Sequence, residues 1–362
     1  MSQTNSTDLR QWITEQAKSL GFAYIAFSPV QAPSPTIGHF DRWIAANLFG
    51  TMSYLPRGRN RRADPNQILP GAKWFISVAV NYSTVEIPAS ITTDPSRGQI
   101  ARYAHGKDYH DWLLPPLLDL GKLLDAKWGV QSKAYVDTGA ILERAVAADG
   151  GTGFIGKNTC LINPRAGSYL LLGELLTTAD LPVPPDQPVG AITEVSMKAK
   201  PSCGSCTRCL QACPSDAILE PFVLDANRCI SYLTIEYRGI IPEELRPKMK
   251  NWIFGCDECQ TCCPWNRFAQ PHRQPELSHD WEEWHPPLLS LIELDEKKFK
   301  ERFADTPLLR PGRDAFLRNV AIALANWNSP EARDALQYLA YDTSPLVRAH
   351  LPRKLLSDDA NG

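Results

Sequence analysis

The chain contains 362 residues, a length that favours two or three domains and allows a sizeable buried core. Hydrophobic residues make up 43% and charged residues 22% of it, values that exclude a disordered or fibrous protein. With 38 basic and 40 acidic side chains the formal net charge is −2, so a generally basic nucleic-acid binder is not indicated, although a local basic face is compatible with this balance.

Apolar runs in the sequence are short. The run over 74–80 has the length of a strand and falls far below the roughly 20 residues that cross a membrane. Residues 1–8 are polar and lack the basic and then apolar layout of a secretory signal. We therefore expect a cytoplasmic protein that works as a monomer without membrane contact.

The first 195 residues alternate the patterns of helices and strands, which is typical of an α/β or α+β layer. Helices are expected from Ser6 to Leu20, from Asp108 to Trp128 with a bend at Pro115-Pro116, and from Ala140 to Ala148. Strands are expected over Phe22–Ser28, Trp74–Tyr82 and Ala134–Asp137.

Two further regions follow this layer. A proline-rich stretch over 180–190 predicts a connection to a cysteine-rich module, which we place at 196–275. Residues 276–362 carry a helical pattern with two short helix pairs that resemble HEAT-type repeats. The expected layout is thus a domain over 1–195, the cysteine module, and a HEAT-like helical domain, for which a plain capping bundle is the alternative.

The cysteines are concentrated in one part of the chain. Nine of the ten lie between Cys203 and Cys263, and Cys160 alone lies outside. In a cytoplasmic chain such clustering indicates a metal or iron–sulfur module rather than disulfides. The spacing Cys-x2-Cys-x2-Cys-x3-Cys-Pro over 203–214 is typical of a [4Fe-4S] site, in which the fourth cysteine usually reaches a second cluster.

A second set of cysteines completes the pattern. Cys256-x2-Cys259-x3-Cys263 is again followed by proline, with Cys262 beside it and Cys229 between the two sets. Two cubes need eight thiolates, and nine are present, so one is spare; spacing alone does not decide whether it is Cys229 or Cys262. A single zinc site is the alternative, but it would use four sulfurs and leave five unexplained.

Iron–sulfur clusters store and pass single electrons, so the pattern predicts a reductase. A non-catalytic electron carrier is the alternative from another class, as is a zinc-bearing adaptor for tRNA. A plain carrier would not need the roughly 200 residues that precede the first cluster cysteine. We therefore expect an enzyme whose first domain holds the compound that is reduced.

Several other segments form a combination more specific than any one of them. They are Ala101–His110, Tyr135–Arg144, Gly151–Asn158, Gly167-Ser168 with Leu172–Glu174, Cys229–Glu236, and Cys263–Asn266. Together with the cysteine spacing and the helical tail, they resemble the epoxyqueuosine reductases of queuosine tRNA biosynthesis over nearly the whole chain. The resemblance implies a cobalamin-dependent enzyme with two [4Fe-4S] clusters that removes the epoxide oxygen of epoxyqueuosine at the wobble position of tRNA and leaves queuosine.

The resemblance also implies ligands for each cofactor. It assigns one cluster to Cys203, Cys206, Cys209 and Cys263, and the other to Cys213, Cys229, Cys256 and Cys259, so that Cys262 becomes the spare thiol. It implies cobalamin contacts from Arg62, Asp137, Leu161, Leu172, Ser231, Cys256 and Asp257. Electrons would come from an external low-potential donor such as ferredoxin or flavodoxin and pass singly to cobalamin, whose Co(I) state reduces the epoxide.

By the same resemblance Asp137 is the proton donor. The leaving oxygen becomes an alkoxide and needs a proton, which a carboxylic acid supplies only while it stays protonated. We therefore expect Asp137 to be buried near the corrin ring, because burial raises the pKa of a carboxyl group. The alternative is that Asp137 caps the helix that follows it.

The partner implied is tRNA, with its anticodon loop over the active site and the modified base in a pocket. Thr234 is an expected contact by its position in the family. Phosphate contacts are expected from local cations, namely Arg238, Lys248, Arg246, Lys250, Arg318 and Arg348.

The alternative enzyme is a reductive dehalogenase, which uses the same pair of cofactors and acts on a small molecule. Such enzymes are generally exported through a twin-arginine signal, whereas the first 30 residues here contain only Arg10. The helical tail also favours an RNA substrate over a small organohalide.

Overall fold

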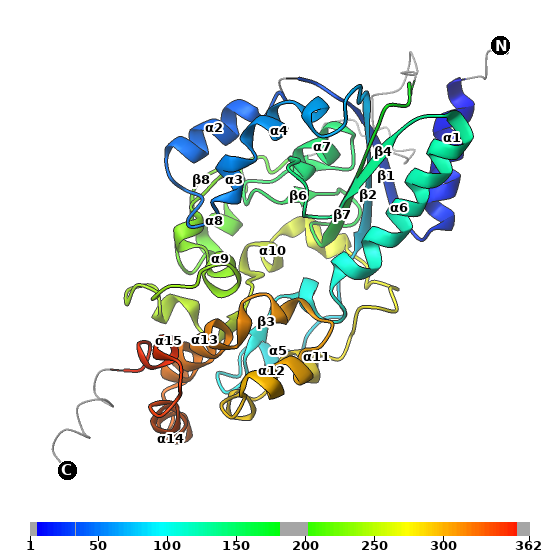
Figure 1. The fold of residues 1–362 in the computed structure, drawn as a ribbon. Helices are drawn as coiled ribbons and strands as arrows, with labels where there is room; N and C mark the ends of the chain where they lie inside the picture. Colours follow the sequence, from blue (N-terminus) through cyan, green and yellow to red (C-terminus); the bar gives the residue numbers. More distant parts are fainter. Residues whose placement is uncertain (1–5, 33, 182–201, 353–362) are drawn as a thin grey trace.

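The computed structural model describes residues 6–32, 34–181 and 202–352 (Figure 1). The expected connection over 180–190 therefore lies outside the described residues apart from its first two positions, as does the boundary near residue 195. No helix in the described ranges is both long and apolar enough to cross a bilayer.

A four-stranded sheet forms the centre of the first domain. Its order is β1-β2-β7-β4, and all three pairings are antiparallel. The fold is therefore mixed, and this sheet places it on the α+β side of the expectation rather than among folds with a parallel sheet. The strands are β1 (Tyr24–Pro29), β2 (Trp74–Asn81), β7 (Leu170–Thr177) and β4 (Ser132–Tyr135).

Helices cover both faces of the sheet (Figure 1). α1 (Ser6–Ser19) and α6 (Tyr109–Trp128) lie on one face, and α7 (Glu143–Asp149) packs on the other. Val78 of β2 belongs to the core under α1 and α6, whereas Phe75 of the same strand belongs to the core on the α7 side. Because both faces are covered, β2 is buried along seven of its eight residues. The prolines in α6 do not interrupt it.

Short elements surround this layer and form the walls of the site described below. The helices are α2 (Ile37–Ala45), α3 (Tyr54–Arg57), α4 (Arg59–Ala63), α5 (Ala89–Thr92), η1 (Pro65–Gln67) and η2 (Arg102–Ala104). The strands are β3 (Gln99–Ile100), β5 (Phe154–Ile155) and β6 (Leu161–Ile162).

The cysteine module is built from short helices and hairpins. Its strand β10 pairs in parallel with β3, so the module shares a small sheet with the first half of the chain. Its elements are α8 (Arg208–Ala212), β8 (Ile218–Glu220), β9 (Val223–Leu224), η3 (Ala226–Arg228), α9 (Ile230–Ile235), η4 (Pro247–Met249), β10 (Trp252–Phe254), α10 (Glu258–Thr261) and η5 (Pro264–Phe268).

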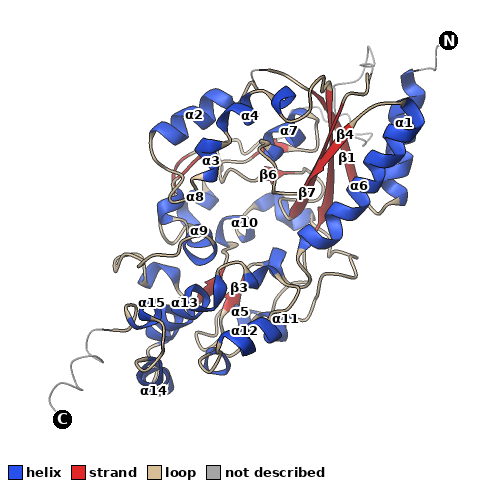
Figure 2. Cartoon of the chain, in the orientation of Figure 1, coloured by secondary structure: helices blue, strands red, loops and turns tan. Residues whose placement is uncertain are grey.

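The C-terminal region is helical (Figure 2). Phe254 of β10 lies in the same hydrophobic core as Phe316 and Leu336, so these helices pack directly on the cysteine module. A HEAT-like repeat structure stays a prediction. The elements are α11 (Trp281–Trp284), η6 (Leu288–Leu291), α12 (Glu296–Arg302), η7 (Pro307–Leu309), α13 (Gly312–Trp327), α14 (Pro330–Leu339) and α15 (Pro345–Arg348).

Arg318 of α13 fastens the C-terminal helices to the module. Its side chain is fully buried and donates hydrogen bonds to the carbonyl groups of Leu233 (2.6 Å), Tyr237 (2.9 Å) and Gly239 (3.0 Å). These carbonyls lie at and beyond the end of α9, where helical partners are missing. The expectation that Arg318 contacts tRNA phosphate is therefore wrong, because its guanidinium group binds the protein's own backbone.

Replacing Arg318 by methionine should lower the free energy of unfolding by about 3 kcal/mol or more, because it leaves one buried and two part-buried carbonyl groups without this donor. Urea unfolding followed by circular dichroism measures the change. The matched control is Arg333→Met, on the exposed face of α14, which should shift stability by less than about 0.5 kcal/mol. Equal stabilities for the two variants would contradict the anchoring role.

Candidate functional site

Four cysteines from two distant segments line one hollow, which we call the first cradle. Cys203, Cys206 and Cys209 come from the loop before α8 and from α8 itself, and Cys263 follows α10. Packing of α8 against α10 brings the two segments together. The Lys157 N–H group donates to the Cys203 sulfur at 3.4 Å, and the Lys157 ammonium donates to two carbonyls of the same loop. The hollow measures about 360 Å³ with its open mouth.

The other four expected ligands form another group, which we call the second cradle. Burial raises the pKa of Cys229, with a contribution from the neighbouring Cys213 thiolate. Burial likewise raises the pKa of Cys256 well above its ordinary value, and the charge of Cys229 adds to the shift. The pKa of Cys259 is raised well above its usual range by a hydrogen bond with Cys160, then by burial and by Cys256. The four thiols thus act on one another, and all four residues are half-buried.

The two remaining cysteines lie beside the cradles. Cys160 was set apart by its place in the sequence, yet its thiol contacts Cys259 of the second cradle, and this bond lowers the pKa of Cys160. Cys262 donates to the Cys259 carbonyl at 3.6 Å. Burial and the charges of Cys209 and Cys263 raise the pKa of Cys262 to about 11. Nothing in the sequence pattern pointed to Cys160, because its neighbour is about 100 residues away.

This arrangement of thiols fits clusters better than a single metal ion. A zinc ion would hold its thiolates at about 2.3 Å from one point. In the described part of the chain, no three Cys, His, Asp or Glu side chains are gathered closely enough to hold one ion. Two sets of four thiols, one of them lining a hollow, match instead the four thiolates that each cube requires.

Asp137 follows β4 and is held by three neighbours. Its carboxylate accepts a hydrogen bond from the Tyr109 hydroxyl at 3.1 Å, and His110 Nε2 lies 3.9 Å from the same oxygen. Its own N–H group donates to the Glu143 carboxylate at 2.8 Å. The side chain is 56% exposed, and its burial against a corrin ring stays a prediction. Asp137 is not a helix cap, because the N-cap of α7 is Leu142.

The buried carboxyl groups lie behind Asp137. Burial, and then the charge of Asp137, raises the pKa of Glu143 to about 8. Glu174 of β7 is fully buried; its Oε2 accepts from the Ser77 hydroxyl at 2.7 Å, and its Oε1 has no partner in the described chain. Burial raises the pKa of Glu174 well above its usual range. The sequence analysis did not single out Glu143 or Glu174, although both residues lie in segments that carry the family resemblance.

An exposed cation, Arg310, and an exposed aromatic residue, Tyr54, belong to the surroundings of Asp137. Arg310 forms an ion pair with Glu236 at 2.7 Å. Burial lowers the pKa of Arg310, but the charges of Glu236 and Asp137 outweigh burial, so the pKa is raised. Tyr54 is 45% exposed and belongs to the same electrostatic neighbourhood. The carboxylate therefore acts electrostatically on an aromatic residue and on a cation.

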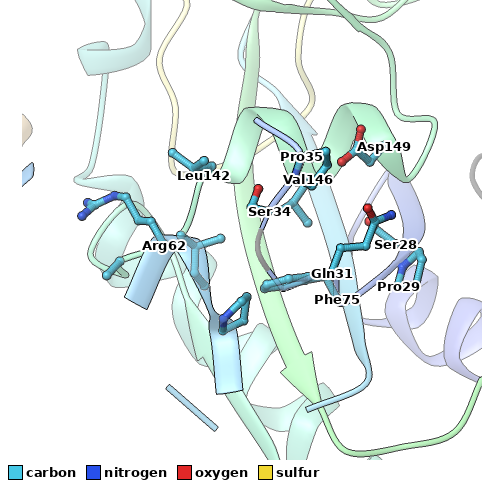
Figure 3. Close-up of a pocket in the computed structure, with 13 residues that line it drawn as sticks. Ser28, Pro29, Gln31, Ser34, Pro35, Arg62, Phe75, Leu142, Val146 and Asp149 are labelled. Atoms are coloured by element: carbon cyan, nitrogen blue, oxygen red, sulfur yellow. The ribbon is translucent and has the colours of Figure 1, made fainter. Parts of the chain in front are cut away.

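Arg62 is buried and lines a second hollow of about 380 Å³ (Figure 3). Ser28 and Pro29 of β1 and Asp149 of α7 line its other side. In Figure 3 the guanidinium group points away from these residues. It donates to the Leu55 carbonyl at 3.3 Å and lies near Glu143, whose charge partly offsets the lowering of its pKa by burial. Arg62 thus belongs to the surroundings of Glu143 and Asp137.

The other expected cobalamin residues come from separate segments. Leu161 of β6 is buried, whereas Leu172 of β7 and Ser231 of α9 are half-buried. Asp257 is almost fully buried; its carboxylate accepts from the Arg102 N–H group at 2.8 Å and lies 3.7 Å from the Arg102 guanidinium. The Asp257 side chain therefore connects η2 to the cysteine module. The backbone of Asp257 is left for other contacts.

The expected tRNA contacts are mostly engaged within the protein. Thr234 is fully buried; its hydroxyl donates to the Ile230 carbonyl at 2.8 Å and accepts from the Gly255 N–H group at 2.9 Å. Its side chain therefore serves the protein's own backbone, and a contact of Thr234 with tRNA stays a prediction. Arg238 is exposed but donates to two backbone carbonyls, and Lys248 forms an ion pair with an aspartate at 2.7 Å.

Known proteins match this chain along its whole length. Residues 62–138 match the family model of epoxyqueuosine reductase QueG, and residues 202–266 match that of the 4Fe-4S double cluster binding domain. The epoxyqueuosine reductase of Xanthomonas campestris is 37% identical over 97% of this chain and 96% of its own. That of Escherichia coli K12 is 38% identical over 88% and 81%. The chain belongs to the epoxyqueuosine reductase family.

Solved structures agree with this assignment, and the chain is accordingly an oxidoreductase. An epoxyqueuosine reductase bound to an epoxyqueuosine-modified tRNA-Tyr stem loop is similar with a TM-score of 0.82 at 34% identity, over 96% of this chain and 89% of that one. The Bacillus subtilis enzyme, with its catalytic aspartate loop swung out of the active site, has a TM-score of 0.80 at 33% identity, over 96% and 89%.

Replacing Glu143 by glutamine tests the buried carboxyl group. Because its pKa is about 8 in the folded chain, against an ordinary value of 4.5, the stability that it contributes is complete below pH 4.5 and is lost as pH rises through 8. Glutamine does not titrate, so the melting temperature of Glu143→Gln relative to the parent should rise between about pH 5 and about pH 9. Differential scanning calorimetry across this range measures it.

Glu301→Gln, at an exposed position in α12, is the matched control and should show no pH-dependent difference. A Glu143→Gln curve that runs parallel to that of the parent would contradict the raised pKa.

Proposed function

We propose that this chain reduces epoxyqueuosine to queuosine in tRNA, with Asp137 as proton donor. The reaction replaces the epoxide by a double bond and releases its oxygen as water, which consumes two electrons and two protons. The observation that carries the proposal is the exposed Asp137 carboxylate, held by Tyr109 and His110, in a chain that also carries two sets of four thiols. The family relationship supports the same reaction.

The proton chemistry falls to a small network. Asp137 delivers a proton to the leaving oxygen, and its exposure leaves it open to a substrate that enters from solvent. His110 Nδ1 lies 2.6 Å from Asp108, which orients the ring with Nε2 toward Asp137. Glu143 binds the Asp137 N–H group and so holds the backbone in its left-handed conformation, with φ of 55°. Aspartate is one of the residues that tolerate this conformation.

A movable Asp137 loop fits this division of labour. The aspartate donates one hydrogen bond to Glu143 and accepts one from Tyr109, and neither buries it. The relative from Bacillus subtilis has been captured with its catalytic aspartate loop swung out. In this chain we place the corresponding movement at the residues after β4.

Electrons would reach the site through two [4Fe-4S] clusters. We assign one to the first cradle, with Cys203, Cys206, Cys209 and Cys263, and the other to the second cradle, with Cys213, Cys229, Cys256 and Cys259. The first cradle lines an open hollow, so an external low-potential donor would meet the first.

The residues present also fit cobalamin. Leu172 and Glu174 share one face of β7, where the unpartnered Glu174 Oε1 can accept a hydrogen bond from an amide such as those at the edge of the corrin ring. Arg62, Leu161 and Ser231 would add contacts, as would the backbone at Cys256 and Asp257. When bound, cobalamin supplies a low-potential centre that combines single electrons into a two-electron reduction.

The tRNA would lie over the exposed side of Asp137. Tyr54 offers an aromatic face and Arg310 a cation beside the carboxylate, which are the groups that bind unstacked bases and phosphates. Arg238 and Lys248 remain proposed contacts, although each must give up a bond within the protein to meet phosphate.

The central experiment is an anaerobic assay with epoxyqueuosine-containing tRNA, a strong chemical reductant, and protein reconstituted with both clusters, with and without cobalamin. Asp137→Asn should lower conversion at least about 100-fold, because it removes the acid and keeps the shape. Mass spectrometry of digested nucleosides measures queuosine. Asp119→Asn, exposed on α6, is the control and should keep full activity. Full activity in Asp137→Asn, with both cofactors intact, would refute the proton-donor role.

Iron analysis tests the assignment of ligands. Cys209→Ser should reduce bound iron from about eight to about four atoms per chain, whereas Cys262→Ser should leave it near eight. Iron and acid-labile sulfide are measured on anaerobically reconstituted protein. If Cys262→Ser instead loses half of the iron, the two adjacent thiols have exchanged roles.

A further inference from the structure

Aromatic side chains surround the mouth of the first cradle. Trp265 lines the hollow, and Phe268, which is 43% exposed, lies 6.4 Å from it. Phe222, which is 55% exposed, donates its N–H group to the Lys157 carbonyl at 3.0 Å, and the N–H group of Lys157 in turn contacts Cys203. Two exposed aromatic residues are therefore joined to residues that line the hollow, Phe222 through its backbone and Phe268 through its ring.

The charged groups at this mouth are cationic. Arg208 is exposed and lines the hollow, and Lys157 lines it as well. The guanidinium group of Arg267 lies 4.4 Å above the ring of Phe268 and is exposed. Among the described residues that line the hollow there is no carboxylate, and no described acidic residue pairs with Arg208 or Arg267. This local excess of positive charge contrasts with the net charge of −2 of the whole chain.

The hollow of the first cradle is where electrons can enter. It is open on one side, and Lys157, Arg208 and Trp265 belong to its lining. A protein that approaches from solution therefore meets the first cradle, at the place where the aromatic and cationic side chains gather.

We propose that this surface, formed by Lys157, Arg208, Phe222, Trp265, Arg267 and Phe268 and called here the carrier face, docks a small acidic one-electron carrier protein. Aromatic residues and arginine are enriched in protein interfaces. Complementary charge speeds the encounter of two partners more than it strengthens their complex. Electron-transfer encounters are typically small, below about 1,200 Å² of buried surface, which suits a patch of six side chains.

The electrons given by the carrier equal those that the reaction consumes. In each encounter the reduced carrier loses one electron and the oxidised cluster of the first cradle gains it, passing from the 2+ to the 1+ state. Two encounters supply the two electrons that one epoxide consumes, while both protons enter at the catalytic site. The inference rests on the proposed function, because it requires the first cradle to hold a cluster.

The test uses the full chain reconstituted with its cofactors, and flavodoxin hydroquinone as the acidic carrier. Arg267→Glu should lower the second-order rate of cluster reduction at low salt at least about tenfold and flatten its salt dependence. Stopped-flow absorbance of the clusters measures this rate. Arg208→Glu should act in the same direction. Arg333→Glu, a charge reversal on the exposed face of α14, is the matched control and should keep the parental rate.

Two further readouts separate the carrier face from the reaction itself. Reduction of the clusters by dithionite, and dithionite-driven conversion of epoxyqueuosine tRNA, should be unchanged in Arg267→Glu. An unchanged flavodoxin rate in both variants would overturn the proposal. Two other results would also overturn it. Loss of binding to a tRNA stem loop, with the flavodoxin rate intact, would assign the face to RNA. Dissociation of a parental dimer by Arg267→Glu, measured by sedimentation, would assign the face to a second copy of the chain. Failure of dithionite-driven conversion in the parent would instead refute the proposed function.

Discussion

The packing of α8 against α10 is the contact on which the rest of the site depends. It joins two cysteine segments about 50 residues apart and closes the first cradle with Cys263. The first half of the chain also takes part, because Lys157 contacts Cys203, and Cys160 contacts Cys259. A metal cluster held here would fix thiols that residues of the first half contact, so cofactor binding and folding are coupled.

The catalytic side shows how one carboxyl group can be left mobile while others are enclosed. Asp137 is exposed, and its backbone is held through Glu143, whose carboxyl is largely enclosed, and Glu174 lies fully buried in the sheet. Burial acts on the pKa of these two supporting groups and leaves Asp137 accessible. The structure thus separates the group that would meet substrate from the groups that position it.

The sequence predicted those features that local spacing determines. The first-cradle cysteines line one hollow as the ferredoxin-like pattern and family resemblance indicated, and the three expected strands lie within two residues of those found. Burial was harder, because it depends on contacts across the chain. Arg318 and Thr234 appeared to be surface residues until the structure placed Arg318 under carbonyls 85 residues earlier. The antiparallel strand order and the neighbours of Cys160 likewise depend on long-range pairing that spacing does not encode.

The shared core of β10 and the C-terminal helices has a consequence for biosynthesis. Phe254 is covered by Phe316 and Leu336, which the ribosome adds long after the last cluster cysteine. During translation, the cysteine module therefore remains without part of its apolar cover until the final helices emerge. Assembly factors that deliver iron and sulfide would therefore meet a module with part of its apolar core uncovered on the nascent chain, and a covered one after release.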